Sequence, residues 1–198
     1  MKKKRKFRPV YLLIPALLAA FALSAVWYWQ NRLAENDVIG ELFYDDTLYA
    51  DEIREAAGKY DLPPELIRAL IKKESRFNAR ATGKAGEVGL MQILPRGAVA
   101  DWARINKCRP PSREELFNVR TNLDIGCWYL ARAMRKWEKY RYRMHLALAE
   151  YNAGAANTAR WKPADPKGEV LSRIDFPGTR EYVRDIMESY YGYVTAKP

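Results

Sequence analysis

Apolar residues recur every three or four positions along most of the chain after residue 47, which is the spacing of one face of an α-helix. No stretch shows the alternation of apolar and polar residues that is typical of a half-buried strand. The pattern predicts helices over about 48–59, 64–75, 95–106 and 143–153, a long helix from an Asn122 cap to about Tyr140, and a last helix capped by Thr179. We therefore expect a mainly α-helical domain over residues 48–195.

The helix predicted over 64–75 carries one acidic residue on its apolar face. Glu74 follows Ile67, Leu70 and Ile71 at spacings of seven, four and three residues, so all four side chains share that face. A carboxyl group on an apolar face loses hydration, which disfavours its charged form and raises its pKa. A glutamate with a raised pKa can act as a general acid near neutral pH, so Glu74 is the main catalytic candidate. The alternative is a helix-end carboxylate held by a salt bridge.

The start of the chain differs from the rest. Residues 1–9 hold six Lys or Arg side chains, and residues 10–29 carry no charge and end in aromatic residues. About 20 apolar residues suffice to cross a bilayer as a helix, and a basic flank stays in the cytoplasm. We expect 10–29 to be a single-pass anchor in the inner membrane, with 30–47 as a linker and the domain in the periplasm. The alternative is a signal peptide cleaved at small residues such as Ala22, which would give a secreted protein.

The charge balance excludes some classes of partner. Six of the 34 basic residues and none of the 24 acidic residues lie in the first thirty positions, which leaves 28 against 24, or +4. That weak charge suits an anionic wall polymer and is too small to argue for nucleic acid. His145 is the only histidine, and one histidine is too few for a histidine-rich metal site and leaves no basis for a His-based catalytic triad. We expect neither a metal nor a cofactor.

The chain has two cysteines, Cys108 and Cys127. In an exported protein an even pair favours a disulfide, which here would tie the Pro110-Pro111 loop to the helix that follows. The alternative is a buried free thiol, because Cys127 shares an apolar stripe with Leu123 and Leu130. We expect the disulfide.

Several short motifs follow one another in the middle of the chain. They are Glu74-Ser75-Arg76-Phe77-Asn78, the segment from Gly86 to Gln92 with Gly89-Leu90-Met91-Gln92, Pro95 just after it, and Glu150-Tyr151-Asn152-Ala153-Gly154. In this order and spacing, with a glutamate 18 residues before the glutamine, they resemble the lysozyme-like lytic transglycosylases of the soluble-transglycosylase type. The resemblance covers about 50–162 and, more loosely, 170–190. It implies a helical domain similar to goose-type lysozyme.

The resemblance implies cleavage of the β-1,4 bond between N-acetylmuramic acid and N-acetylglucosamine in peptidoglycan. In that family the muramyl C6 hydroxyl attacks C1 to give a 1,6-anhydro product, and one glutamate acts first as acid and then as base. Ordinary glycosidases need two flanking carboxylates. We find no second acidic residue beside Glu74 with a comparable claim, and we expect Glu87 to lie solvated in its loop. If the 2-acetamido group of the substrate stabilises the oxocarbenium-like state, a second carboxylate is not needed.

Two other functions stay open for this fold. One is a muramidase that uses water as the acceptor, and the other is a non-catalytic wall-binding scaffold for a cell-wall or secretion machine. The expected partners are peptidoglycan strands and, through residues 10–29, the inner membrane.

The resemblance also implies a set of residues that bind the sugar chain, namely Ser75, Met91, Gln92, Tyr151 and Asn152. Each has a structural alternative, such as a helix end for Ser75 and core packing for Met91 and Tyr151. Glu150 stands where alanine is common among relatives, and we expect it to face solvent. Two departures from the family pattern matter. Gly83 stands where many relatives have serine, and Gly178 where they often carry a glutamate that contacts substrate.

Overall fold

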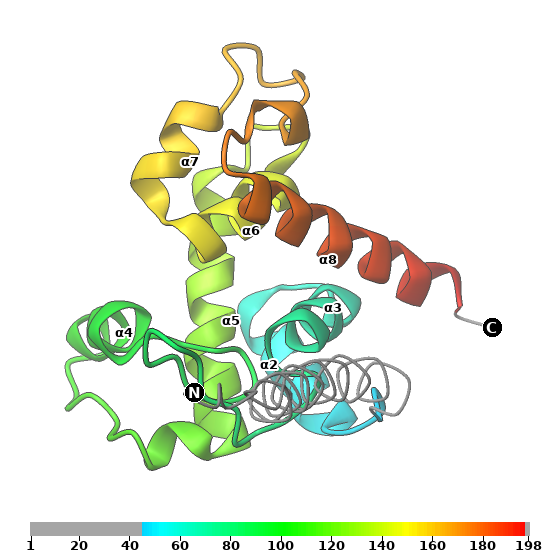
Figure 1. Cartoon of the computed structure of the whole chain (residues 1–198). Coiled ribbons are helices and arrows are strands. Elements are labelled where there is room, and N and C mark those ends of the chain that lie inside the picture. Colours follow the sequence, from blue (N-terminus) through cyan, green and yellow to red (C-terminus); the bar gives the residue numbers. More distant parts are fainter. Residues whose placement is uncertain (1–44, 197–198) are drawn as a thin grey trace, which may run out of the picture. The chain divides into compact units, whose positions relative to one another are not determined.

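The part of the chain that the computed structural model describes, residues 45–196, consists almost entirely of helices (Figure 1). The predicted anchor over 10–29 and nearly all of the predicted linker lie outside the described residues. Within residues 45–196, no helix combines the length and apolar character needed to cross a bilayer. The prediction of a mainly α-helical domain is confirmed.

The predicted helices occur in the predicted order. The helices of the structure are α2 (Ala50–Tyr60), α3 (Pro64–Ser75), η1 (Pro95–Val99), α4 (Ala100–Ile105), η2 (Glu115–Phe117), α5 (Val119–Lys136), α6 (Arg143–Ala153), α7 (Ala155–Trp161), η3 (Leu171–Arg173) and α8 (Pro177–Thr195). The helix expected over 95–106 is divided into η1 and α4, and three further short helices, η2, α7 and η3, were not predicted. Between α3 and η1 the chain forms a loop, in which two isolated antiparallel bridges join Val88 to Thr82 and to Ile93.

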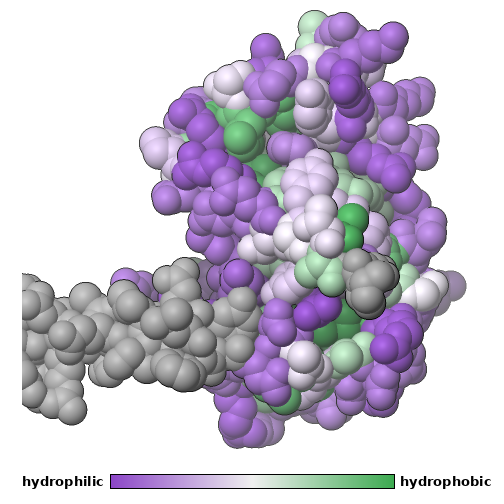
Figure 2. All heavy atoms as spheres, turned by 90° about the vertical axis from the view of Figure 1, so that its right-hand side faces the viewer, coloured by the Kyte–Doolittle hydropathy of each residue, from purple (hydrophilic) through white to green (hydrophobic). Residues whose placement is uncertain are grey.

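The long helix α5 lies at the centre of this unit, with α2 and α6 packed against it (Figure 1). Helix α8 begins beside α6 and runs past α3 toward the C-terminus. The apolar face of α3 is fully buried between these elements and includes Leu66, Ile67, Leu70 and Ile71. Charged and polar residues dominate the face shown in Figure 2, where apolar side chains appear only as small patches. The apolar stripe read from the sequence is therefore what holds α3 in the core.

The predicted Asn122 cap is wrong. Helix α5 begins three residues earlier, and its N-cap is Asn118, whose side chain accepts a hydrogen bond from the backbone N–H of Thr121 at 3.1 Å. Asn122 is instead 1% exposed, inside the protein. The Thr179 cap is also wrong, because α8 begins at Pro177 after an extended residue and has no side-chain cap. Both polar residues have partners in other segments, which local spacing does not reveal.

Asn122 fastens the loop after α3 to α5. Its Oδ1 accepts from the backbone N–H of Met91 at 2.8 Å, and its Nδ2 donates to the carbonyls of Val88 and Leu116, both at 2.8 Å. Gly89 permits this approach, because a β-carbon there would lie 2.3 Å from the Asn122 Nδ2, and its φ of 77° favours glycine. The buried amide is thus fully paired, as an interior polar group must be.

The predicted disulfide is wrong. Both cysteines are free, with Cys108 exposed just after α4 and Cys127 fully buried in α5. The Cys127 thiol lies 3.8 Å from the sulfur of Met91, so it belongs to the apolar stripe that was the alternative interpretation. Burial raises the pKa of the Cys127 thiol far above its usual range, which keeps it protonated and unreactive.

We predict that Asn122→Ala lowers the free energy of unfolding by about 3 kcal/mol, because it removes the partner of the Met91 N–H and of the Leu116 carbonyl and one of the two partners of the Val88 carbonyl. The control is Asn118→Ala, which removes the exposed cap and should cost about 1 kcal/mol. Urea denaturation measures both. Equal losses in the two variants would contradict the anchoring role of Asn122.

Candidate active site

Glu74 lies in the last turn of α3, half-buried against α8. Its Oε1 accepts a hydrogen bond from the Tyr182 hydroxyl of α8 at 2.5 Å. Within residues 45–196 no ion pair forms to Glu74, because the neighbouring Lys73 pairs with Asp185 of α8 at 2.7 Å. The salt-bridge alternative for Glu74 is therefore not what the structure contains. The chain turns sharply after this helix, because Arg76 and Phe77 both adopt left-handed backbone angles.

Burial raises the pKa of Glu74 from 4.5 to about 7. The hydrogen bond from Tyr182 opposes this shift, since it stabilises the carboxylate, and the charge of Lys73 opposes it as well. The negative charge of Glu87 adds to the shift. A carboxyl group with a pKa of about 7 is partly protonated at neutral pH and can both give and take a proton.

Tyr182 is a site residue that sequence reasoning did not single out. It lies on the buried face of α8 and is 6% exposed. Its hydroxyl reaches Glu74 across 108 residues of sequence. Burial, with the charge of Glu74, raises the pKa of the Tyr182 phenol well above its usual range, so it stays a hydrogen-bond donor. The available signal was a phenol on a buried face, which needs a polar partner.

Tyr151 of α6 comes to the same place. Its hydroxyl donates to the backbone carbonyl of Met91 at 2.8 Å, and its ring meets that of Tyr129 edge to face with centroids 5.5 Å apart. Burial raises the pKa of the Tyr151 phenol well above its usual range, and the charge of Glu74 contributes to that shift. The structure thus brings together Glu74, Met91 and Tyr151, three of the predicted site residues.

Gln92 lies in the loop fastened by Asn122. Its Nε2 donates to the carbonyls of Gly89 at 2.8 Å and Ala81 at 3.2 Å, and its own φ is 44°, a left-handed value. Gln92 and Tyr151 line a cleft between η1, α5 and α6. The cleft also contains Ile93, Leu94, Gly97, Ala98, Tyr129, Asn152, Ala153 and Gly154. Glu74 does not line this cleft, but Tyr151 connects the two, because the charge of Glu74 acts on its phenol. Such a concave surface is the kind of place where a ligand binds.

The remaining predicted binding residues make contacts within the protein, and these contacts do not by themselves indicate a role in binding. The Ser75 hydroxyl bonds back to the Ile71 carbonyl at 3.3 Å, which is a helix-end contact. The side chain of Met91 is fully buried, so only its backbone carbonyl takes part. Asn152 is exposed, and its Oδ1 accepts from the Thr179 hydroxyl at 2.7 Å. Their contact with substrate stays a prediction.

Two expectations about acidic residues are wrong. Glu150 does not face solvent, because it is 2% exposed and its Oε2 accepts from the Trp137 ring N–H and from Lys136, both at 2.8 Å. It is a structural carboxylate between α5 and α6. Glu87 is not fully solvated, because it is half-buried and close enough to raise the pKa of Glu74. Across residues 45–196 no group of three or more His, Cys, Asp or Glu could hold a metal ion.

Comparison with known proteins identifies the family. The Transglycosylase SLT domain model matches residues 51–170, more than half of the chain. The chain therefore belongs to the SLT-domain transglycosylase family.

Two curated relatives carry the same name. Membrane-bound lytic murein transglycosylase C from Edwardsiella ictaluri is 31% identical over 132 residues, which are 64% of this chain and 36% of that protein. The protein of the same name from Salmonella paratyphi B is 34% identical over 117 residues, or 57% of this chain and 32% of that protein. The chain thus spans about a third of the length of these relatives.

Solved structures share the fold. An inactive mutant of the lytic transglycosylase Slt from Pseudomonas aeruginosa superposes with a TM-score of 0.65 at 24% identity, covering 77% of this chain and 25% of that one. The 70 kDa soluble lytic transglycosylase from Escherichia coli gives 0.63 at 24% identity, covering 78% and 25%. The same type of enzyme in complex with bulgecin A gives 0.62. The fold of the described domain is that lysozyme-like helical fold.

We predict that Glu74→Gln makes the protein more stable at pH 8 by roughly 2 kcal/mol, after allowance for partial exposure of the side chain. The folded pKa of about 7 lies above the ordinary value of 4.5, so the contribution of Glu74 to stability is most favourable below pH 4.5 and is lost as the pH rises through 7. Urea denaturation at pH 5 and pH 8 checks this. An advantage that is the same at both pH values would contradict the raised pKa.

Proposed function

We propose that this protein is a peptidoglycan lytic transglycosylase, with Glu74 as its single acid and base. The observation that carries the proposal is the buried Glu74 carboxyl, whose pKa of about 7 lies within the range that a group needs in order to donate and later recover a proton at neutral pH. Membership of the SLT-domain family and the relatives named lytic murein transglycosylase support the choice of substrate.

In the proposed reaction, protonated Glu74 gives its proton to the oxygen of the β-1,4 bond between N-acetylmuramic acid and N-acetylglucosamine. The bond from C1 to that oxygen breaks, and its electron pair goes to the oxygen. The muramyl C6 hydroxyl then attacks C1, and its proton returns to the Glu74 carboxylate. The product carries a 1,6-anhydro ring, and no water is consumed.

The tyrosines and the loop have separate roles in this proposal. Tyr182 stabilises the Glu74 carboxylate after the first step, because its hydroxyl already donates to Oε1. Tyr151 presents a ring beside the cleft, and Gln92 and Asn152 offer amide groups to the sugars. Ser75 and the backbone at Met91 complete the proposed contacts. None of these roles requires a cofactor.

A water-using muramidase is the second candidate, and one observation favours it. Glu87 places a second carboxylate close enough to influence Glu74, and a pair of carboxylates is the usual equipment of a hydrolase. Mass spectrometry of digested peptidoglycan separates the two candidates, because the transglycosylase leaves 1,6-anhydro ends and the muramidase leaves reducing ends.

We predict that Glu74→Gln lowers turnover of peptidoglycan by roughly a thousandfold while binding to sacculi is retained, because the amide cannot supply the proton. The matched control is Glu138→Gln, which makes the same change at an exposed position in the segment after α5 and should leave turnover unchanged. Undiminished digestion by Glu74→Gln would refute catalysis by Glu74, and retained biological function would favour the wall-binding scaffold.

The proposed location is the inner membrane, with residues 10–29 as a single-pass anchor, the N-terminus in the cytoplasm and the domain in the periplasm. The basic and apolar pattern of the first 29 residues and the membrane-bound relatives support it. An alkaline phosphatase fused to the C-terminus should be active in cells and stay in the membrane fraction. Activity released to the soluble periplasm would indicate the cleaved signal peptide instead.

A further inference from the structure

Two hydrogen-bond acceptors converge above Gly83, where the chain has no side chain. A β-carbon built on Gly83 would lie 2.1 Å from Oε2 of Glu87 and 3.0 Å from Oε1 of Gln92. The missing side chain is what gives the Glu87 carboxylate its position, because any other residue at 83 would displace it. The backbone closes the turn beneath, with the Gly83 N–H bonded to the Glu87 carbonyl at 3.0 Å.

The amide of Gln92 has a defined orientation at this point. Its Nε2 donates to the backbone carbonyls of Ala81 and Gly89, so the nitrogen is committed and Oε1 is the atom that faces Glu87. An amide turned the other way would set its oxygen against two carbonyl oxygens, which is unfavourable. The group next to the Glu87 carboxylate is therefore an acceptor and not a donor.

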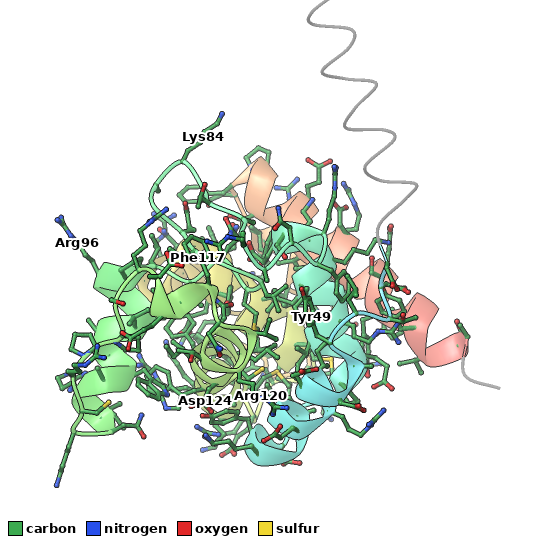
Figure 3. The ribbon with its side chains drawn as sticks, turned by 90° about the horizontal axis from the view of Figure 1, so that it is seen from below. Tyr49, Lys84, Arg96, Phe117, Arg120 and Asp124 are labelled. Carbon is green, nitrogen blue, oxygen red and sulfur yellow. The ribbon has the colours of Figure 1, made fainter. Side chains whose placement is uncertain are left out.

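The Glu87 carboxylate is held in place without being neutralised. Its Oε2 accepts from the backbone N–H of Ala85 at 2.9 Å. Among residues 45–196 no ion pair to Glu87 is found, and the nearby Lys84 extends from the loop away from the domain (Figure 3). Two acceptors that face each other with no donor between them repel, so this arrangement is suited to a ligand that brings a hydrogen.

We propose that Glu87 and Gln92 form a seat with two acceptors above Gly83, which binds the attacking hydroxyl of the reaction and makes Glu87 a second catalytic carboxylate. This inference rests on the proposed function of the site. The hydroxyl has two sources, the C6 hydroxyl of the muramyl ring or a water molecule, and the chemistry of the seat is the same for both. In the bound substrate the hydroxyl donates its hydrogen to the seat. After Glu74 has given its own proton to the leaving oxygen, that hydrogen turns to the Glu74 carboxylate and is transferred to it as the hydroxyl oxygen bonds to C1.

The surroundings of Glu74 agree with a charged Glu87. The groups that face Glu74 come from all sides, namely Tyr182 from α8, Tyr151 from α6, Lys73 from its own helix and Glu87 from the loop. Of these, Glu87 is the only other carboxyl group, and its negative charge contributes to the raised pKa of Glu74. The same charge favours the positive charge that develops on the sugar ring as the bond breaks.

The test is Glu87→Gln in the full chain, compared with wild type and with the exposed control Glu138→Gln, on purified peptidoglycan. The new amide can keep its oxygen on the Ala85 N–H, but it loses the negative charge and replaces the other carboxylate oxygen with a donor. We expect kcat to fall roughly ten- to hundredfold, because a hydrogen bond to a charged group is lost. The alkaline limb of the kcat/KM profile should also move to lower pH, because Glu74 loses the negative neighbour that raises its pKa.

A second variant, at Gly83, tests the seat without changing either acceptor. Gly83→Ala places a methyl group where the Glu87 carboxylate now lies, so it should reproduce the loss in kcat with both acceptors still present in the chain. The matched control is Gly58→Ala in α2, where a β-carbon meets nothing within 4 Å, and turnover should be unchanged. Thermal unfolding of all variants separates loss of the seat from loss of the fold.

The outcomes decide between the alternatives. Wild-type kcat and an unmoved alkaline limb in Glu87→Gln, or wild-type kcat in folded Gly83→Ala, overturn the seat and leave the proposed function standing. Digestion by Glu74→Gln at the wild-type rate overturns the proposed function itself. The wild-type products identify the source of the hydroxyl, since 1,6-anhydro ends indicate the C6 hydroxyl and reducing ends indicate water.

Discussion

The buried side-chain amide of Asn122 joins the loop after α3 to the central helix α5. Asn122 projects from the central helix α5 and bonds to the backbone of Val88 and Met91 on one side and Leu116 on the other. Every group that the loop brings near Glu74 depends on these bonds, since Gln92 and the Met91 carbonyl follow directly along the chain. A residue without chemistry of its own therefore sets the geometry in which the reactive groups meet.

The position of Glu74 lowers the stability of the folded domain. Glu74 is half-buried, and within residues 45–196 one hydrogen bond, from Tyr182, is found to it. The cation beside it, Lys73, pairs with Asp185 instead. An ion pair with Lys73 would stabilise the charged carboxylate and lower its pKa, which would remove the proton that the reaction needs. The domain thus gives up stability at one helix end to keep an acid near neutral pH.

Local pattern was sufficient for part of this structure. The spacing of Glu74 after Leu70 and Ile71 correctly placed it at the buried end of a helix, because side chains three and four residues apart share a face. It could not identify Tyr182, whose contact with Glu74 spans 108 residues, and it mistook Asn122 for a local cap. When two polar residues pair across the fold, the residues near each one in the sequence do not identify its partner.

The errors about charge and cysteine have a similar origin. The disulfide was expected from an even count of cysteines, but the apolar stripe around Cys127 decided its position, and Cys108 lies in solvent. Glu87 was expected in water because it lies in a loop. The bare Gly83 instead lets the carboxylate fold over the backbone toward the site. The composition of a loop indicates which backbone conformations it can adopt. The position of each side chain depends on contacts that form only in the folded protein.

The order of the segments along the chain has a consequence for biosynthesis. Glu74 is translated early, but the helix that shields it from water, α8, is the last element of the domain to leave the ribosome. A chain that ends before Pro177 lacks Tyr182 and leaves the Glu74 carboxyl more exposed to water, so less of the burial that raises its pKa is present. The raised pKa of Glu74 thus depends on packing that is completed only after α8 has been synthesised.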